Sequence, residues 1–400
     1  MKVLCLIDSL GPGGAQRQLA NLAAGLKERG HDIRFLVYHR QEHFLPLLQA
    51  AEIDCETLES NSRVTRLLDV RRALRKGKHD VVLAFLTGPS LYAELASLPR
   101  RRWGLVIGER SASPRIVRGL ESWLRQGHRL ADSVVTNSHT TRLLLERSCP
   151  FLKDKIATIY NFVDLERFSP TPSELGDESD TLEADTNEGV FRLVVAAGYD
   201  ENKNMIGLAK ALLLLDNDVR RRVVVDWYGS MRQDLAAYES ATSFVRANGL
   251  ESSLRFHDAS TSIEKEYLIA DAVGLFSYHE GLANALCEAM ACARPIIASN
   301  VSDAQNLVLD GINGLLCEAG SPRSIADAIE GMAKSRITER RRMGDESRRM
   351  ALNLFDKHRV LEHYERVLEC AANNEKLKGP HWPSDVPDSA EKTARRLGGW

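Results

Sequence analysis

Short apolar runs alternate with amphipathic segments through the first 168 residues of the chain. Lys2–Asp8 opens with an apolar run that predicts a buried strand, and Ala15–Arg29 repeats apolar residues at helical spacing through Leu19, Leu22 and Leu26. Further strands are predicted at 33–38, 81–85, 105–107, 134–136 and 156–159, with helices near 64–76, 88–98, 114–130 and 139–147. This alternation indicates a parallel sheet covered by helices, an α/β domain of Rossmann-like type.

A second series of strands and helices begins at Val190. Strands are predicted at 190–197, 223–227, 254–256, 273–276, 296–298 and 314–316. Ser321 and Pro322 are typical of the N-cap and first residue of a helix, which we expect to extend to Met332. Between the two series, Ser169–Gly189 contains seven acidic residues, two prolines and no basic residue. Such a segment buries too little apolar surface to fold and is predicted to be a linker or loop.

The chain is therefore predicted to contain two α/β domains, residues 1–168 and 190–355, separated by the acidic segment 169–189. An amphipathic helix follows at 356–372, with its apolar face on Val360, Tyr364, Val367 and Leu368. Residues 374–400 are polar and include three prolines, so we expect this tail to be disordered.

The stretch Ser277–Ala298, SYHEGLANALCEAMACARPIIA, carries the clearest candidate chemistry. It is predicted to pass from a strand end through a turn into a helix and then into a new strand. Glu280 falls in the turn, and Glu288, eight positions later, falls inside the helix. The amides of Ala283, Asn284 and Ala285 would lie at the helix N-terminus, which attracts anions. Two carboxylates beside an anion site suit a ligand with hydroxyls and phosphates, such as a nucleotide-sugar; an ordinary surface helix with two glutamates is the alternative.

Glu280-Gly281, Glu288–Ala291 and Pro295–Ala298 together resemble the signature of retaining glycosyltransferases of family 4 (glycosyl transferases group 1), which have the GT-B fold. The resemblance implies two Rossmann-like domains that face each other across a cleft, with residues 1–168 and the helix 356–372 binding the acceptor and 190–355 the donor. It also implies that Glu280 lies beside the donor sugar and that Glu288 hydrogen-bonds the ribose. Tyr160–Phe168 is similar to the segment that joins the domains in this family.

Two further loops carry the resemblance. Gly11-Pro12-Gly13-Gly14 resembles the N-terminal glycine-rich loop of the family, so Gly13 and Gly14 are expected to border the donor diphosphate. Gly198–Asn204 resembles a loop in which an arginine and a lysine neutralise that diphosphate: Lys203 matches the lysine, and Gly198 replaces the arginine.

The chain also departs from the family at two further positions. Asn306 replaces a loop glutamate, and Leu86-Thr87-Gly88 stands where many members carry a histidine near the acceptor. Glu109 and Arg110 follow a predicted strand and therefore lie at the ligand-binding edge of a parallel sheet, either as part of a site or as an exposed ion pair.

The resemblance implies transfer of a hexosyl or N-acetylhexosaminyl group from a nucleotide-diphosphate sugar, expected to be a UDP-sugar, to an acceptor hydroxyl with retention of configuration. Glu280 and Lys203 are the predicted catalytic residues, and preorganised positive charge would stabilise the leaving diphosphate. No cofactor or metal is expected, because Asp216-Asn217-Asp218 is a poor copy of a D-x-D metal motif. The alternatives are a nucleotide-sugar epimerase or hydrolase, a noncatalytic partner subunit, and an NAD(P) oxidoreductase, which is disfavoured because Gln16 replaces the last glycine of the dinucleotide fingerprint.

Charge and composition bear on where in the cell the protein is expected to act. The net charge of −2 combines +8 in residues 1–168, from 26 Lys and Arg against 18 Asp and Glu, with −10 in the rest. The basic clusters Arg71–Lys78 and Arg100–Arg102, the latter next to Trp103, fit an anionic membrane surface or a solvated face. The seven cysteines form no CxxC pair, and no signal sequence or membrane span is apparent, so we expect a cytoplasmic protein. The basic balance of residues 1–168 predicts peripheral association with the inner face of the membrane. The family resemblance implies a glycan or lipid-linked acceptor in polysaccharide biosynthesis, and no nucleic acid partner is expected.

Overall fold

The computed structural model describes residues 1–60, 62–110, 112, 116–170, 189–230, 234–377 and 388–398. These residues form two compact units. The first unit comprises Met1–Phe162 and most of the chain from Lys357 onward, and the second comprises Val163–Asp356. Each unit is built around its own parallel sheet, so the two-domain α/β prediction is confirmed.

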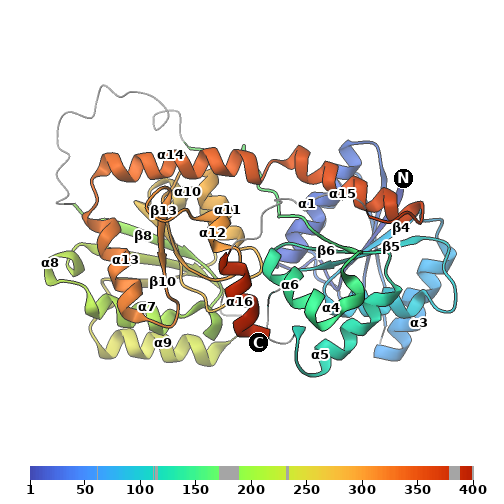
Figure 1. Cartoon of the computed structure of the whole chain (residues 1–400), viewed down its shortest axis with the longest axis horizontal. Helices are drawn as coiled ribbons and strands as arrows, with labels where there is room; N and C mark the ends of the chain where they lie inside the picture. Colours follow the sequence, from blue (N-terminus) through green and yellow to red (C-terminus); the bar gives the residue numbers. More distant parts are fainter. Residues whose placement is uncertain are drawn as a thin grey trace. The chain divides into compact units, whose positions relative to one another are not determined.

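The first unit, in which Figure 1 labels β4, β5 and β6, contains a sheet. Its strand order is β3-β2-β1-β4-β5-β6-β7, with all neighbours parallel. Its strands are β1 (Lys2–Leu6), β2 (Asp32–Val37), β3 (Asp54–Thr57), β4 (Val81–Phe85), β5 (Gly104–Glu109), β6 (Ser133–Thr136) and β7 (Ile156–Thr158). Its helices include α1 (Gly14–Glu28), α2 (Leu45–Ala50), α3 (Arg63–Lys76), α4 (Thr87–Ala96), α5 (Gly119–Leu124) and α6 (His139–Ser148), with the 3₁₀ segment η2 at Arg125–Leu130.

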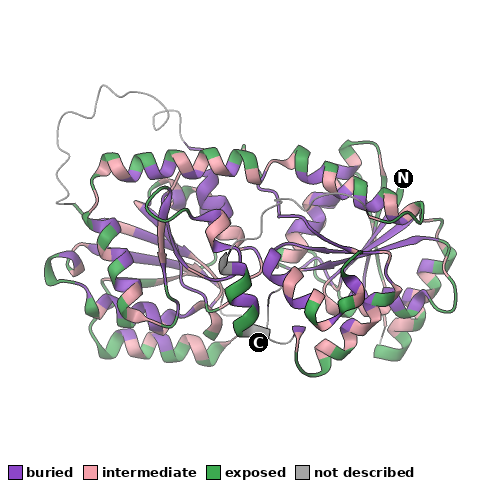
Figure 2. Ribbon diagram, in the orientation of Figure 1, coloured by how far each residue is buried: buried purple, intermediate pink, exposed green. Residues whose placement is uncertain are grey.

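Helices cover both faces of this sheet because its strands are apolar on both sides. In β1, Val3 and Cys5 belong to one core cluster, which α1 and the late helix α15 (Lys357–Ala372) help to build. Leu4 and Leu6 belong to a second cluster on the opposite face, with residues of α3, α4 and α6. Figure 2 shows the same arrangement, with buried strands and helices exposed on their outer sides.

The second unit contains a six-stranded parallel sheet with the order β10-β9-β8-β11-β12-β13. Its strands are β8 (Phe191–Ala196), β9 (Val223–Gly229), β10 (Leu254–Asp258), β11 (Ala272–Leu275), β12 (Ile296–Ser299) and β13 (Gly314–Cys317). Its helices are α7 (Met205–Leu214), α8 (Asn217–Arg220), α9 (Leu235–Ala247), α10 (Ile263–Leu268), α11 (Asn284–Ala291), α12 (Ala304–Leu307), α13 (Pro322–Lys334) and α14 (Ile337–Leu354), with the 3₁₀ segment η6 at Glu201–Lys203.

The segment between the sheets belongs to the second unit from Val163 onward, earlier than the predicted boundary at 168. Three contacts of this segment lie within that unit. Arg167 pairs with Glu264 at 2.8 Å, and Arg348 donates hydrogen bonds to the carbonyls of Leu165 and Phe168. Most of the predicted acidic linker, 171–188, lies outside the described residues.

The late helix α15 packs on the first unit against α1, β4 and β5. Gly104 permits this packing, because a Cβ there would lie 2.4 Å from the backbone of Ala371. The expected disorder of the tail is wrong over Asp388–Gly398, which form helix α16. Ala390 and Ala394 are buried, and Thr140 donates to the carbonyl of Ala390 at 3.5 Å, so small apolar residues give this polar segment a packed face. Within the described part of the chain, no helix is both long and apolar enough to span a bilayer.

Candidate active site

The candidate site of the second unit lies where β11 ends and α11 begins. Glu280 is in the loop between them, and Glu288 is inside α11, as the spacing predicts. Ala283 is the N-cap residue of α11, and Asn284 and Ala285 are its first two residues, so their amides lie at the helix N-terminus. Glu288 is buried at 6% exposure within the apolar helix segment that leads to β12. A buried carboxylate of this kind requires polar partners.

Lys203 and Glu280 form an ion pair, with Nζ and Oε1 2.5 Å apart. The two side chains keep 19% and 16% of their exposure, so the pair lies at the edge of solvent. Burial alone would lower the pKa of Lys203, but the charge and hydrogen bond of Glu280 raise it above its usual value. Lys203 therefore carries a full positive charge next to the N-terminus of α11.

Asn202 fastens the Lys203 loop to the Glu280 loop. Its side-chain nitrogen donates to the carbonyl of His279 at 2.9 Å, and its side-chain oxygen accepts from the amide of the same residue at 3.1 Å. The amide of Tyr278 also donates to the carbonyl of Asn202 at 2.9 Å. Three hydrogen bonds at one residue thus fix the geometry of the ion pair.

Asn204 supports the same arrangement from the start of α7. Its backbone is left-handed, with φ 64°, a conformation that asparagine tolerates better than most residues. Its side chain donates to the carbonyls of Phe276 and Ala319 at 3.2 and 2.8 Å. Asn202 and Asn204 are the residues that reading the sequence missed. Two asparagines beside Lys203 could have suggested this role from the sequence. Their hydrogen-bond partners, however, are at least 72 residues away in the chain, where no local pattern indicates them.

Gly198 leaves the Lys203 loop without a second cation. A Cβ at this position would meet only the carboxylate of Asp200, at 3.5 Å. Burial raises the pKa of that carboxyl group, with Lys203 acting in the opposite direction. Lys203 is consequently the cation that this loop provides for an anion.

A small pocket opens beside Glu280 and is lined by Ser277, Leu282, Ser299, Ser302 and Asp303. Ser302 donates to the carbonyl of Gly281 at 2.7 Å, which fixes the turn between Glu280 and α11. Asn306, which replaces a glutamate of the family motif, lies in the short helix α12 that follows this pocket.

In the first unit, Gly13 is the N-cap residue of α1, and Gly14 is the first residue of that helix. Gln16 folds over this turn: its side chain donates to Asp8 at 3.0 Å, and a Cβ on Gly13 would lie 2.1 Å from its Oε1. The glycine thus permits a close approach of the loop backbone by a polar side chain.

Glu109 and Arg110 are not an exposed ion pair. Glu109 is 3% exposed and is bound by Arg125 and His128. Arg110 lies over the ring of Phe85 and hydrogen-bonds Asn161 and the hydroxyl of Tyr364, which joins the end of β5 to α15. Of the two alternatives predicted here, the exposed ion pair is wrong, because the partners of Glu109 come from a later segment of the chain.

The predicted basic clusters are partly engaged inside the first unit. Arg71 and Arg75 donate to the carbonyl of Leu98 after the end of α4, and Arg101 pairs with Asp132. Trp103 is 7% exposed and belongs to the core, so it is not a surface aromatic.

The two aspartates of the Asp216-Asn217-Asp218 motif form ion pairs with nearby cationic side chains. Asp216 binds Lys334 at 3.0 Å, and Asp218 pairs with Arg221 at the start of the short helix α8. Among the residues that the structure describes, no group of three or more His, Cys, Asp or Glu side chains is placed to hold a metal ion.

Two family models match the chain in sequence order. Residues 12–167 match the model for Glycosyltransferase Family 4, and residues 191–335 match the model for Glycosyl transferases group 1. Together they span most of the chain and include the loops that contain Gly13, Lys203, Glu280 and Glu288.

Individual proteins agree with the family models. An N-acetylgalactosaminyltransferase of Campylobacter jejuni, named for an undecaprenol-diphosphate-linked glycan acceptor, is 26% identical over 82% of this chain and 88% of its own. The N-acetyl-α-D-glucosaminyl L-malate synthase of Bacillus anthracis is 23% identical over 62% of each chain. The crystal structure of Anabaena HepE in complex with UDP-glucose superposes with a TM-score of 0.78 at 20% identity, over 92% of this chain and 99% of that one.

The two parallel α/β units, the order of the motif-bearing loops and these matches agree with one another, and the chain therefore belongs to the GT-B glycosyltransferases of family 4, glycosyl transferases group 1.

Proposed function

We propose that this glycosyltransferase transfers a hexosyl or N-acetylhexosaminyl group from a UDP-sugar to a hydroxyl of a lipid-linked glycan, with retention of anomeric configuration. The observation that carries the proposal is the Lys203–Glu280 ion pair beside the N-terminus of α11, with Glu288 buried in the same helix. The named activity of the Campylobacter relative and the UDP complexes of HepE supply the donor and acceptor classes.

The donor site has separate polar groups for each part of a UDP-sugar. Lys203 and the amides of Ala283–Ala285 would meet the diphosphate, whose negative charge grows as the bond to the sugar breaks. Glu288 would accept hydrogen bonds from the ribose hydroxyls. Glu280 would orient the sugar, whose anomeric carbon gains positive character in the transition state.

Lys203 would change partners when the donor binds. Without donor, Glu280 neutralises Lys203 at 2.5 Å. A bound diphosphate would share Lys203 and free part of the Glu280 carboxylate for the sugar. Gly198 leaves space but no charge next to this site, so Lys203 would carry the electrostatic role that the family divides between two cations.

The first unit would receive the acceptor, and Gly13 and Gly14 would border the donor diphosphate. Peripheral membrane association is part of this proposal. Arg71, Arg75 and Arg101 bind partners within the unit, so these arginines of the basic clusters do not carry this part of the proposal. It rests instead on the net charge of +8 of residues 1–168.

The test is a panel of UDP-, GDP- and ADP-sugars incubated with a prenyl-diphosphate-linked N-acetylgalactosamine probe, with product configuration read by NMR. We expect transfer from a UDP-sugar with retention, undiminished by EDTA. Inversion, or loss on chelation with rescue by Mn²⁺ or Mg²⁺, would contradict the mechanism. Donor turnover without transfer would favour a hydrolase or epimerase, and nucleotide binding without turnover would favour a noncatalytic partner subunit.

A further inference from the structure

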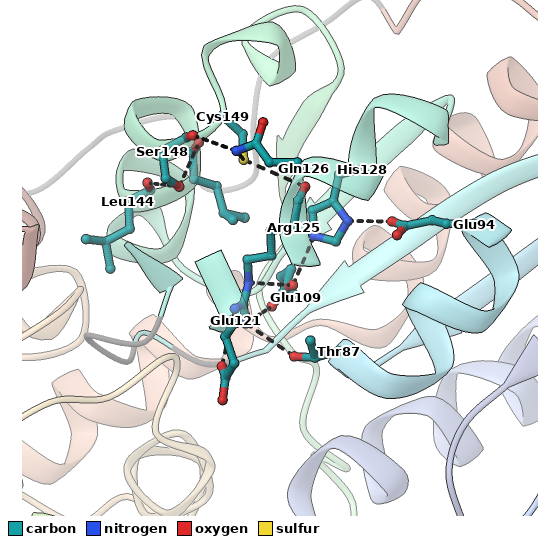
Figure 3. Close-up of polar contacts among 11 residues, drawn as sticks. Thr87, Glu94, Glu109, Glu121, Arg125, Gln126, His128, Leu144, Ser148 and Cys149 are labelled. Carbon is teal, nitrogen blue, oxygen red and sulfur yellow. Dashed lines mark hydrogen bonds and ion pairs between the residues drawn. The ribbon is translucent and has the colours of Figure 1, made fainter. Parts of the chain in front are cut away.

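Four charged side chains form a buried network at the end of β5 in the first unit (Figure 3). Glu109 accepts from Arg125 at 3.0 and 3.3 Å and binds Nε2 of His128 at 3.1 Å. His128 Nδ1 lies 2.5 Å from Glu94 of α4. All four residues are between 1% and 3% exposed.

The network joins α4, β5 and η2, and it balances two carboxylates against two cationic side chains. Burial alone would lower the pKa of His128, but its hydrogen bonds to Glu109 and Glu94 raise it to about 9, so the ring is charged near neutral pH. Buried ion networks give little net stability over well-packed apolar residues, so their presence favours a role in fixing geometry.

Arg125 extends the network toward solvent. Its guanidinium also donates to the hydroxyl of Thr87 at 3.3 Å and to Glu121 of α5 at 3.3 Å. Thr87 is half-buried, is the first residue of α4, and precedes the exposed Gly88. The hydrogen-bond path that starts in the core therefore reaches the surface at Thr87, at the carboxyl end of β4.

The backbone is strained at the same corner. Leu86, between β4 and Thr87, has φ 76° and ψ 154°, a region that few residues other than glycine adopt. The corner is held because the amide of Leu86 donates to the carbonyl of Gly108 and the amide of Ser90 donates to the carbonyl of Leu86. The buried ion network and the strained backbone of Leu86 both meet at Thr87, and neither favours stability. Features of this kind cluster at functional sites.

We propose that Thr87 contacts the acceptor and that Arg125, held by Glu109, is the residue that positions it. Because the Arg125 N–H donates to Thr87 Oγ1, the hydroxyl proton of Thr87 is left to be donated to an oxygen of the acceptor glycan. Ligands of parallel α/β sheets bind beyond the carboxyl ends of the strands, which is where Thr87 lies. This inference rests on the proposed function, in which the first unit receives the acceptor.

The test compares Thr87→Val, which removes the hydroxyl, with Thr87→Ser, which keeps it, using the prenyl-diphosphate-linked N-acetylgalactosamine probe and a UDP-sugar. We expect Thr87→Val to raise the acceptor KM about fivefold or more, as one lost hydrogen bond predicts. The donor KM, the UDP Kd and the melting temperature should stay near the wild-type values. Thr87→Ser should restore the acceptor KM, and Thr57→Val, on the exposed strand β3, is the matched control.

Arg125→Lys tests the positioning role, since lysine keeps the charge but loses the planar fork that binds Glu109 and Thr87 together. It should raise the acceptor KM in the same direction, with the donor KM unchanged. An acceptor KM unaffected by Thr87→Val, or an equal change in donor KM, would overturn this inference alone. Failure of the wild-type protein to transfer any sugar would overturn the proposed function and the inference with it.

Discussion

Two groups of charged side chains, one in each unit, are held in different ways. In the second unit, Lys203 and Glu280 form a single ion pair that keeps 16–19% exposure and joins two loops. In the first unit, Glu94, His128, Glu109 and Arg125 form a network of two carboxylates and two cationic side chains that is at most 3% exposed. A pair at the edge of solvent can exchange one partner for a ligand, whereas the buried network holds its own elements in place and reaches the surface through Arg125 and Thr87. The contrast separates groups proposed to bind substrate from groups proposed to position others.

Lys203→Ala removes the cation of the partly exposed ion pair, and among the single variants we expect it to lower activity the most. We expect kcat to fall about 100-fold or more, because a preorganised cation is lost where charge develops in the transition state. Donor affinity should fall less. The measurement is steady-state kinetics with saturating acceptor probe, and a change confined to KM would reassign Lys203 to ground-state binding.

Glu288→Gln should weaken UDP binding by roughly 1–3 kcal/mol, because the carboxylate proposed to accept hydrogen bonds from the ribose hydroxyls becomes a neutral amide. Isothermal titration calorimetry with UDP measures this directly. Glu239→Gln, on the exposed side of α9, is the matched control and should bind UDP as the wild type does. Equal affinities for all three proteins would remove Glu288 from the donor site.

Proximity in sequence explains which parts of the site were predictable. Glu280, the N-terminus of α11 and Glu288 fall within one stretch whose strand-turn-helix pattern is local, so their placement follows from spacing. The contacts of Asn202 and Asn204 depend on two loops more than 70 residues apart, and no local pattern reports them. The partners of Glu109 come from η2, 16 and 19 residues later, which is why an exposed pair with Arg110 was an equally good interpretation.

The fold shows the same limit. Strands with continuous apolar runs, such as β4, were predictable, but β3 was not, because its four residues are mostly exposed at the sheet edge. Helix α16 was missed because its composition is polar, and the burial of Ala390, Thr393 and Ala394 gives it a packed face. Tertiary packing, rather than composition, decides such segments.

The pH dependence of stability tests the charge states of the buried network in the first unit. The folded pKa of His128, about 9, lies above its usual 6.5, so its contribution is complete below about pH 6.5 and is lost as the pH rises through 9. Burial raises the pKa of Glu109, but Arg125 and His128 outweigh it and lower the value to about 2, so that contribution is lost only as the pH falls from about 4.5 toward 2.

Thermal unfolding should therefore show stability that falls between pH 6.5 and 9 in the wild-type protein, and a weaker decline in His128→Asn. His363→Asn serves as the matched variant, since burial lowers the pKa of that histidine and it makes no contribution of this sign. Parallel pH profiles for wild type and His128→Asn would show that the ring is not charged in the network.

Membrane binding should give the smallest effect. Lys76 and Lys78 are exposed, and each surface cation contributes about 1 kcal/mol on an anionic bilayer. Replacing both with glutamine should reduce co-sedimentation with anionic vesicles several-fold, and added salt should reduce it further. Equal binding of the wild-type protein to neutral and anionic vesicles would leave the basic clusters as a solvated face.

The most direct test of the proposed donor site is a double-mutant cycle on Lys203 and Glu280, measured as kcat/KM for the UDP-sugar. Two groups that meet one donor as a unit should be strongly non-additive: Lys203→Ala, Glu280→Ala and the double variant should all lose a similar, large part of the activity. Additive losses, or single variants that keep wild-type kcat/KM, would contradict the assignment of donor chemistry to this ion pair.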